Sequence, residues 1–146
     1  MALDELYKEV ILDHYKNPRN KRPLPEATVS RRKNNPLCGD DIALHAQLAG
    51  DLVAEVAFEG QGCSISQASA SMLTEAVKGK NLKEAAHLAA EFRAMMQGSV
   101  DPDEDEFGDL VALKGVVRYP VRIKCAVLAW DVLQEALEEP SAHPES

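Results

Sequence analysis

The sequence lacks the features that mark membrane-spanning and secreted proteins. No run of apolar residues approaches the ~20 positions that a membrane-spanning helix needs. The N-terminal segment MALDELYKEV lacks the basic-then-apolar pattern of a secretion signal. Only three cysteines are present, far apart in the chain, and such spacing favours free thiols or metal ligands over disulfides. We therefore expect a cytoplasmic protein with no membrane partner.

Basic residues are in the minority, with 16 against 24 acidic residues and a formal net charge of −8. A general nucleic-acid binder needs a basic surface, so no nucleic-acid partner is expected. Seven of the bases nevertheless lie within residues 16–33, where Glu26 is the only acid, and an acidic stretch covers 101–109. Two solvated loops explain this pattern, and electrostatic steering of a protein partner is the alternative.

Two enzyme classes lack their usual residues. Gly60-Gln61-Gly62 is not followed by the glycine or lysine of a phosphate-binding loop. A cysteine protease needs a histidine base. The four histidines fall on predicted helices, a predicted strand and the tail, and we expect all of them at the surface: His14, His45, His87 and His143.

The chain is long enough for one domain, 1–146, with a flexible tail from about 139 to 146. At this length, folding hides about 68–70% of the unfolded chain's surface. The fold therefore needs no metal, and a metal site would serve function.

Hydrophobic periodicity predicts the first elements. A helix is expected over 3–16, ended by Asn17-Pro18. Residues 18–37 are predicted to be mostly loop, with a short strand near 27–30. Alternating apolar residues over 42–59 predict a hairpin that turns at Gly50-Asp51, with Leu52 on the same face as Val56.

The second half is predicted to be helical. One helix starts just after Cys63 and ends near Val77, and the next starts at Asn81, where Glu84 completes a capping box, and ends near 97. An acidic loop over 98–108, a short helix over 109–116 and a last helix from Pro120 follow. A small antiparallel sheet of about three strands packed against helices, an α+β fold, is therefore expected.

Each cysteine has a neighbourhood that suits metal or sulfur chemistry. Cys38 precedes Gly39 and Asp40, and a thiolate with a carboxylate could form half of a zinc site. Cys63 and Cys125 fall at predicted helix starts, where partial positive charge favours thiolate, and Arg122 lies one turn before Cys125. Packing as small hydrophobic residues is the alternative for each, because the spacing is not Cys-x-x-Cys.

The cap of the predicted helix after Cys63 is expected to be Ser64 or Ser66, since serine oxygens accept hydrogen bonds from the first free backbone N–H groups.

These motifs together resemble the U-type iron–sulfur cluster assembly proteins, and among them the SufU-type form of the SUF system. The matching segments run from residue 6 to about 138. They are Leu6-Tyr7 to Asn17-Pro18, Cys38-Gly39-Asp40, Gly62-Cys63-Ser64-Ile65-Ser66-Gln67-Ala68-Ser69, Arg122-Ile123-Lys124-Cys125-Ala126 and Leu128-Ala129-Trp130.

The resemblance implies a zinc site formed by Cys38, Asp40, Cys63 and Cys125. It implies a partner, a pyridoxal-phosphate cysteine desulfurase, whose persulfide sulfur Cys38 would accept. Arg122 would support this step, by stabilising the displaced charge or by holding Asp40. The protein would then be an accessory of an enzyme rather than an enzyme in its own right.

Two departures from the scaffold-type relatives favour the sulfur relay. Lys124 stands where those relatives carry histidine, and a lysine ammonium cannot ligate a metal. The segment around 98–108 is an insertion that they lack. Two alternatives stay open. The chain could be a scaffold that holds a [2Fe–2S] cluster on Cys38, Cys63 and Cys125 for a downstream scaffold or apoprotein, or a zinc-stabilised interaction domain without sulfur chemistry.

Overall fold

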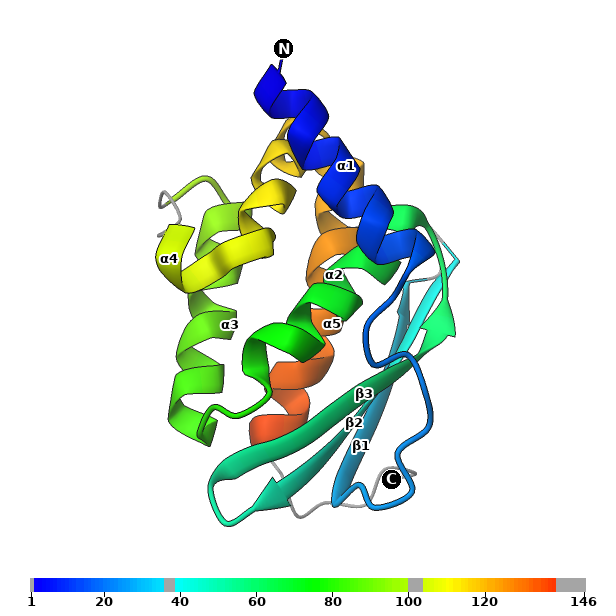
Figure 1. Ribbon diagram of the computed structural model, residues 1–146, viewed down its shortest axis with the longest axis vertical. Helices are drawn as coiled ribbons and strands as arrows, with labels where there is room; N and C mark the ends of the chain where they lie inside the picture. The colour runs from blue at the N-terminus through cyan, green and yellow to red at the C-terminus, as the bar shows by residue number, and fades with distance from the viewer. Residues whose placement is uncertain (1, 36–38, 100–103, 139–146) are drawn as a thin grey trace.

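The computed structural model describes residues 2–35, 39–99 and 104–138, without the side chains of 2–7, 104 and 106. Cys38 and the predicted flexible tail, 139–146, therefore lie outside the described residues. A three-stranded sheet and a set of helices form one layered body, in which the sheet packs against α2 and α5 (Figure 1). This arrangement confirms the predicted α+β class.

The sheet is antiparallel in the order β1-β2-β3, with strands Val29–Asn35, Asp40–Ala49 and Leu52–Gln61. The predicted hairpin is confirmed as β2 and β3. The predicted extent of the first strand, near 27–30, was wrong, because β1 continues to Asn35. Its sequence, VSRRKNN, is polar, and charged side chains are typical of an edge strand. Pairing with β2, such as Arg32 opposite Ala43, defines β1, and no local apolar pattern reveals it.

A register shift between Gln47 and Leu48 changes the phase of β3. Gln47 pairs with Glu55 and Leu48 with Val53, so Ala54 is the extra residue of a bulge. Val53 is consequently buried and Leu52 is 41% exposed. The prediction that Leu52 shares the buried face with Val56 was therefore wrong, since a bulge moves later side chains to the opposite face.

The helices follow the sequence predictions closely. Their bounds are α1 Ala2–Lys16, α2 Ser64–Val77, α3 Leu82–Met96, α4 Glu104–Phe107, the 3-10 helix η1 Gly108–Arg118 and α5 Pro120–Glu138. The Asn81 side chain accepts a hydrogen bond from the Glu84 N–H, and the Glu84 side chain accepts one from Asn81, which confirms the capping box. The acidic segment is less open than expected because Glu104–Phe107 forms a helical turn.

The core lies where α2 and α5 pack on the sheet and α3 packs on α5. Phe92 of α3 stacks on Trp130 of α5, with ring centroids 4.7 Å apart. Trp130 Nε1 donates to Ser69 Oγ over 3.2 Å, and Ser69 Oγ donates to the Ala126 carbonyl over 2.6 Å. These contacts fix α5 against α2, and both helices start at the same end of the molecule.

His14 is fully buried, which contradicts the prediction that it lies at the surface. Its Nδ1 lies 2.8 Å from Ser71 Oγ and its Nε2 2.9 Å from Asp109 Oδ2. Ser71 Oγ also accepts the Arg19 N–H over 2.9 Å. One imidazole therefore joins α1 to both α2 and η1.

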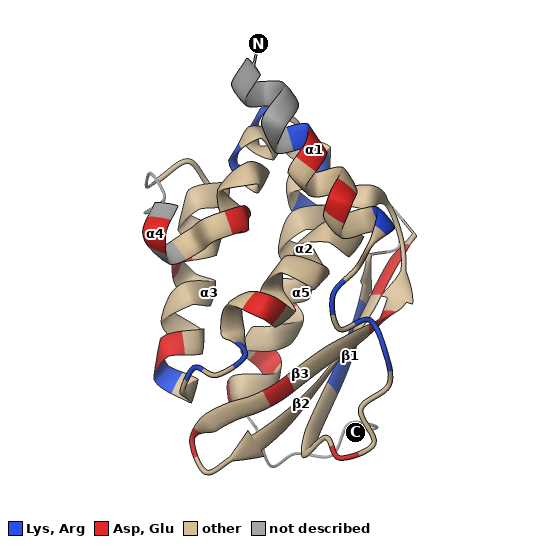
Figure 2. Ribbon diagram, viewed as in Figure 1, with Lys and Arg blue, Asp and Glu red and all other residues tan. Residues whose placement is uncertain are grey.

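Basic residues follow β1 and the segment that leads to it from α1 (Figure 2). Acidic side chains of neighbouring elements neutralise several of them: Arg19 pairs with Asp13, Arg22 with Glu55, Arg32 with Asp41 and Lys33 with Glu135. These surface pairs favour the interpretation of the basic stretch as solvated, but Arg31, Arg32 and Lys33 lie in β1 and not in the predicted loop. Within the described chain, no helix combines the length and apolar character needed to cross a membrane.

Candidate metal and sulfur site

Asp40 is a fully buried carboxylate at the start of β2. Its Oδ1 accepts the Cys63 N–H over 2.9 Å, and its Oδ2 lies 3.9 Å from Cys63 Sγ. A buried carboxylate is costly without positive charge or several hydrogen bonds around it. This side chain thus provides an anionic oxygen beside a thiol, away from water.

Cys63 occupies the N-cap position of α2 and has an extended backbone with φ −72°. Its side chain makes no capping bond, and the Asp40 carboxylate takes its N–H instead. The prediction that Ser64 or Ser66 caps the helix was wrong. Ser66 Oγ donates to the Cys63 carbonyl over 3.1 Å, so Ser66 stabilises the turn from inside the helix.

Cys125, fully buried in α5, completes the described group. One ligand atom each from Asp40, Cys63 and Cys125 all lie within 4.8 Å of one another. The three residues come from β2, the β3–α2 junction and α5, so the fold brings together groups distant in sequence. Three of the four residues expected to form the site therefore lie close together.

Two glycines make room for β2, one beside its backbone and one beside the Asp40 carboxylate. A Cβ on Gly62 would lie 2.3 Å from Asp40 Oδ1 and 2.7 Å from Ser66 Oγ, and its φ of +156° is rarely adopted by other residues. A Cβ on Gly60 would lie 1.9 Å from the Asp41 carbonyl oxygen. Both positions therefore need glycine for the close approach of this turn to β2.

Arg122 supplies positive charge to the two thiols from the first turn of α5. Attraction by the anionic form of Cys63, together with a hydrogen bond to Cys125, raises the pKa of the Arg122 guanidinium above its usual value. The proximity predicted for Arg122 and Cys125 from helical spacing agrees with this contact. The Arg122 guanidinium therefore lies close enough to stabilise a negative charge on either sulfur.

The donor set fits zinc. Zinc takes thiolate and carboxylate ligands in tetrahedral sites, with Zn–S near 2.3 Å and hence ligand sulfurs about 3.8 Å apart. Donor atoms that all lie within 4.8 Å of one another are close to that spacing. Three described residues leave one tetrahedral position to fill, and the predicted ligand Cys38 lies outside the described residues. Lys124 is exposed and its ammonium offers no lone pair.

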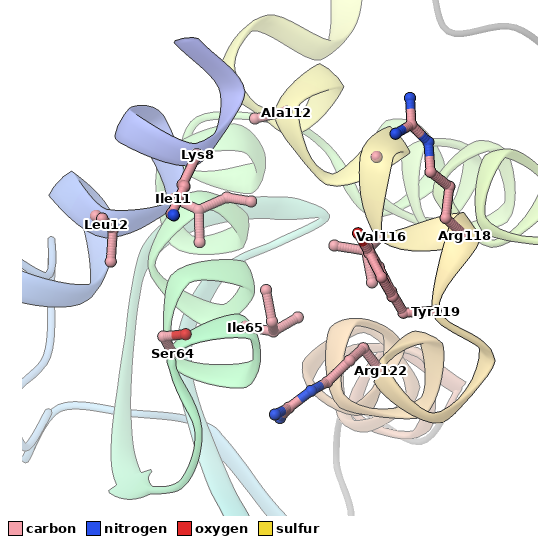
Figure 3. Close-up of a pocket in the computed structure, with 11 residues that line it drawn as sticks. Lys8, Ile11, Leu12, Ser64, Ile65, Ala112, Val116, Arg118, Tyr119 and Arg122 are labelled. Carbon is pink, nitrogen blue, oxygen red and sulfur yellow. The ribbon is translucent and has the colours of Figure 1, made fainter. Parts of the chain in front are cut away.

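A cavity of about 500 Å³ lies beside this site. Figure 3 shows α1 and η1 on its two sides, with Arg122 extending from α5 near the start of α2. Ser64 and Arg122 belong both to its lining and to the neighbourhood of the thiols. Ile11, Ile65 and Val116 give it an apolar interior.

Comparison with known proteins extends over nearly the whole chain. The model of the NifU-like N-terminal domain matches residues 6–144. The chain is 51% identical to the zinc-dependent sulfurtransferase SufU of Bacillus subtilis, over 92% of this chain and 91% of that protein. It is 43% identical to the iron-sulfur cluster assembly scaffold protein IscU of Streptococcus pyogenes, over 93% of this chain and 85% of that one.

A solved structure agrees with the sequence matches. It is a putative iron-sulfur cluster assembly scaffold protein for the SUF system from Fervidobacterium islandicum, with a TM-score of 0.84 and 35% identity. The alignment covers 88% of this chain and 94% of the other. With the gathered Asp40, Cys63 and Cys125, these matches confirm the resemblance inferred from the motifs: the chain belongs to the NifU-like N-terminal domain family.

Proposed function

We propose that this protein serves iron–sulfur cluster biogenesis as a zinc-binding sulfur acceptor for a cysteine desulfurase. The observation that carries the proposal is the convergence of Asp40, Cys63 and Cys125 within 4.8 Å. The Bacillus relative, named as a zinc-dependent sulfurtransferase, supports the same combination of metal and sulfur chemistry.

Zinc would be held by Asp40, Cys63 and Cys125, with Cys38 as the fourth ligand, and would keep the thiols as thiolates. Cys38 lies two residues from Asp40 in sequence, so chain connectivity keeps their Cα atoms within about 7 Å. Gly39 has φ +73° and open space around it, which lets the backbone turn between the two.

Sulfur transfer is a thiol–persulfide exchange. Docking on the desulfurase would have to free Cys38 from the metal. The Cys38 thiolate then attacks the terminal sulfur of the desulfurase persulfide, a new S–S bond forms on Cys38, and the desulfurase cysteine leaves as thiolate. The terminal sulfur keeps its proton, so charge and redox state balance. Arg122, in contact with the thiols at Cys63 and Cys125, would stabilise negative charge at this end of the molecule.

A persulfide assay tests the proposal. The protein, a cysteine desulfurase and cysteine are mixed, and persulfide is mapped by mass spectrometry, with Cys38→Ser as the comparison variant. We expect sulfur on Cys38 and a rise in desulfurase turnover that the variant lacks. Absence of sulfur from Cys38, with unchanged turnover, refutes the relay.

A scaffold function is the second candidate, favoured by the Streptococcus relative named as a scaffold. Cys38, Cys63 and Cys125 would then hold a [2Fe–2S] cluster. Anaerobic reconstitution separates the two functions. A stable cluster that passes to an apoprotein supports the scaffold, and zinc that iron cannot displace supports the relay.

A further inference from the structure

Gln67 on α2 carries a buried side-chain amide. Its residue is 3% exposed, and neither Nε2 nor Oε1 has a hydrogen-bond partner in the part of the chain that the structure describes. An oxygen of Asp131 is also buried, but it forms an ion pair with Arg93. Gln67 is therefore the exception among the buried polar side chains described.

Three buried polar residues on the same helix have hydrogen-bond partners. Ser66 donates to the Cys63 carbonyl over 3.1 Å, Ser69 to the Ala126 carbonyl over 2.6 Å, and Thr74 to the Ser71 carbonyl over 2.7 Å. Burying an unpaired amide lowers stability, and a leucine or methionine would fill the space without that cost. A hydrogen-bond partner that is present only in another chemical state of the site would remove this cost.

Helix geometry places Gln67 next to the sulfur site. It follows Cys63 by four residues, and its backbone N–H donates to the Cys63 carbonyl over 3.1 Å. Side chains on a helix lean toward the N-terminus and cover the preceding turn. For Gln67 that turn begins with Cys63, whose sulfur belongs to the cluster with Asp40 and Cys125.

The chemistry of sulfur explains when the partner appears. A thiol is a weak acceptor, whereas a thiolate is anionic and accepts N–H groups strongly. The Cys63 N–H is already used by Asp40, so the first turn of α2 does not offer that donor to sulfur. The Gln67 amide supplies a neutral donor from within the same helix.

We propose that Gln67 is a positioning residue whose Nε2–H donates a hydrogen bond to the Cys63 sulfur when zinc holds that sulfur as thiolate. This inference rests on the zinc site of the proposed function. Hydrogen bonds to metal ligands fix their orientation and tune their charge, and their loss weakens metal binding about 10- to 100-fold.

The test separates a ligand-supporting role from a packing role by measuring two quantities. Zinc affinity is measured by chelator competition, and the stability of the reduced, zinc-free protein by urea unfolding. Gln67→Met keeps the length of the side chain and removes its polar atoms, and Gln134→Met, at a half-buried position of α5, is the matched control.

We expect Gln67→Met to bind zinc 10- to 100-fold more weakly, while its zinc-free urea midpoint stays equal to the wild type or rises. The thiolate charge-transfer band of the cobalt-substituted protein should shift in Gln67→Met and stay unchanged in Gln134→Met.

Zinc affinity of Gln67→Met within twofold of the wild type overturns the inference, and so does a zinc-free variant that is less stable or fails to fold. The proposed function is tested separately by the wild type. If the wild type binds zinc and Gln67→Met matches it, only the inference fails. If the wild type binds no zinc, both fail.

Discussion

At the scale of single residues, the site depends on the absence of a side chain at Gly62. Replacing Gly62 by alanine puts a Cβ 2.3 Å from Asp40 Oδ1 and must displace the carboxylate from Cys63. We expect a loss of zinc binding and a loss of about 1–3 kcal/mol of stability, measured by chelator competition and urea unfolding. Gly98→Ala is the control, because Gly98 has φ +77° with no atom near its Cβ position. Equal zinc affinity in both variants contradicts the steric argument.

Asp40 allows a finer test of charge against shape. Asp40→Asn keeps an oxygen that can accept the Cys63 N–H, and it removes the negative charge offered to zinc. We expect a folded protein with helical circular dichroism like the wild type and zinc binding at least tenfold weaker. Asp41→Asn is the matched control, since Asp41 faces Arg32 instead of the thiols. A similar loss in both variants would show a general effect of charge.

At the scale of elements, His14 is the joint between α1 and the helices beneath it. Replacing this fully buried imidazole by alanine leaves Ser71 without its side-chain partner and removes the link to Asp109. We expect a loss of about 2 kcal/mol in urea unfolding and faster amide exchange along α1. His87 is exposed on α3, and His87→Ala should change stability by less than about 0.5 kcal/mol. Amide exchange in α1 that is the same in His14→Ala as in the wild type would show that His14 does not hold α1 in place.

The elements differ in how far sequence alone defines them. The capping box at Asn81 and the turn at Gly50-Asp51 are local patterns. The helix α3, which starts at this capping box, and the hairpin of β2 and β3, which this turn joins, were both predicted from them. Strand β1 was predicted too short because its residues are polar and its hydrogen bonds go to β2. The burial of His14 depends on partners 57 and 95 residues away, which no helical pattern reveals.

The candidate site shows the same division. Glycines, helix starts and family motifs identified Asp40, Cys63, Cys125 and Arg122, and the structure places these four residues together. Gln67 stands in one of the matching family segments, but no role was predicted for it, because a glutamine in an Ala- and Ser-rich helix does not reveal whether its amide is buried. Only the burial of its side chain makes the residue conspicuous.

At the scale of the whole molecule, the core and the metal site are separable. One apolar cluster extends from β2 and β3 through α2, α3 and α5, and it contains the stacked Phe92 and Trp130. None of the site residues is needed to fill that cluster. Zinc removal by a chelator under reducing conditions should therefore leave helical circular dichroism and a cooperative thermal transition. Loss of the transition would instead favour a zinc-stabilised interaction domain.

Zinc should still stabilise the folded chain by mass action. At free zinc 1,000-fold above its dissociation constant the gain is about 4.1 kcal/mol, and each kcal/mol raises Tm by roughly 2–4 °C in a domain of this size. Binding requires deprotonated thiols at Cys63 and Cys125, so protons compete with the metal. The Tm difference between zinc-loaded and zinc-free protein should consequently shrink as pH falls. Calorimetry across a pH series checks this, and a difference independent of pH would show that thiolates do not hold the metal.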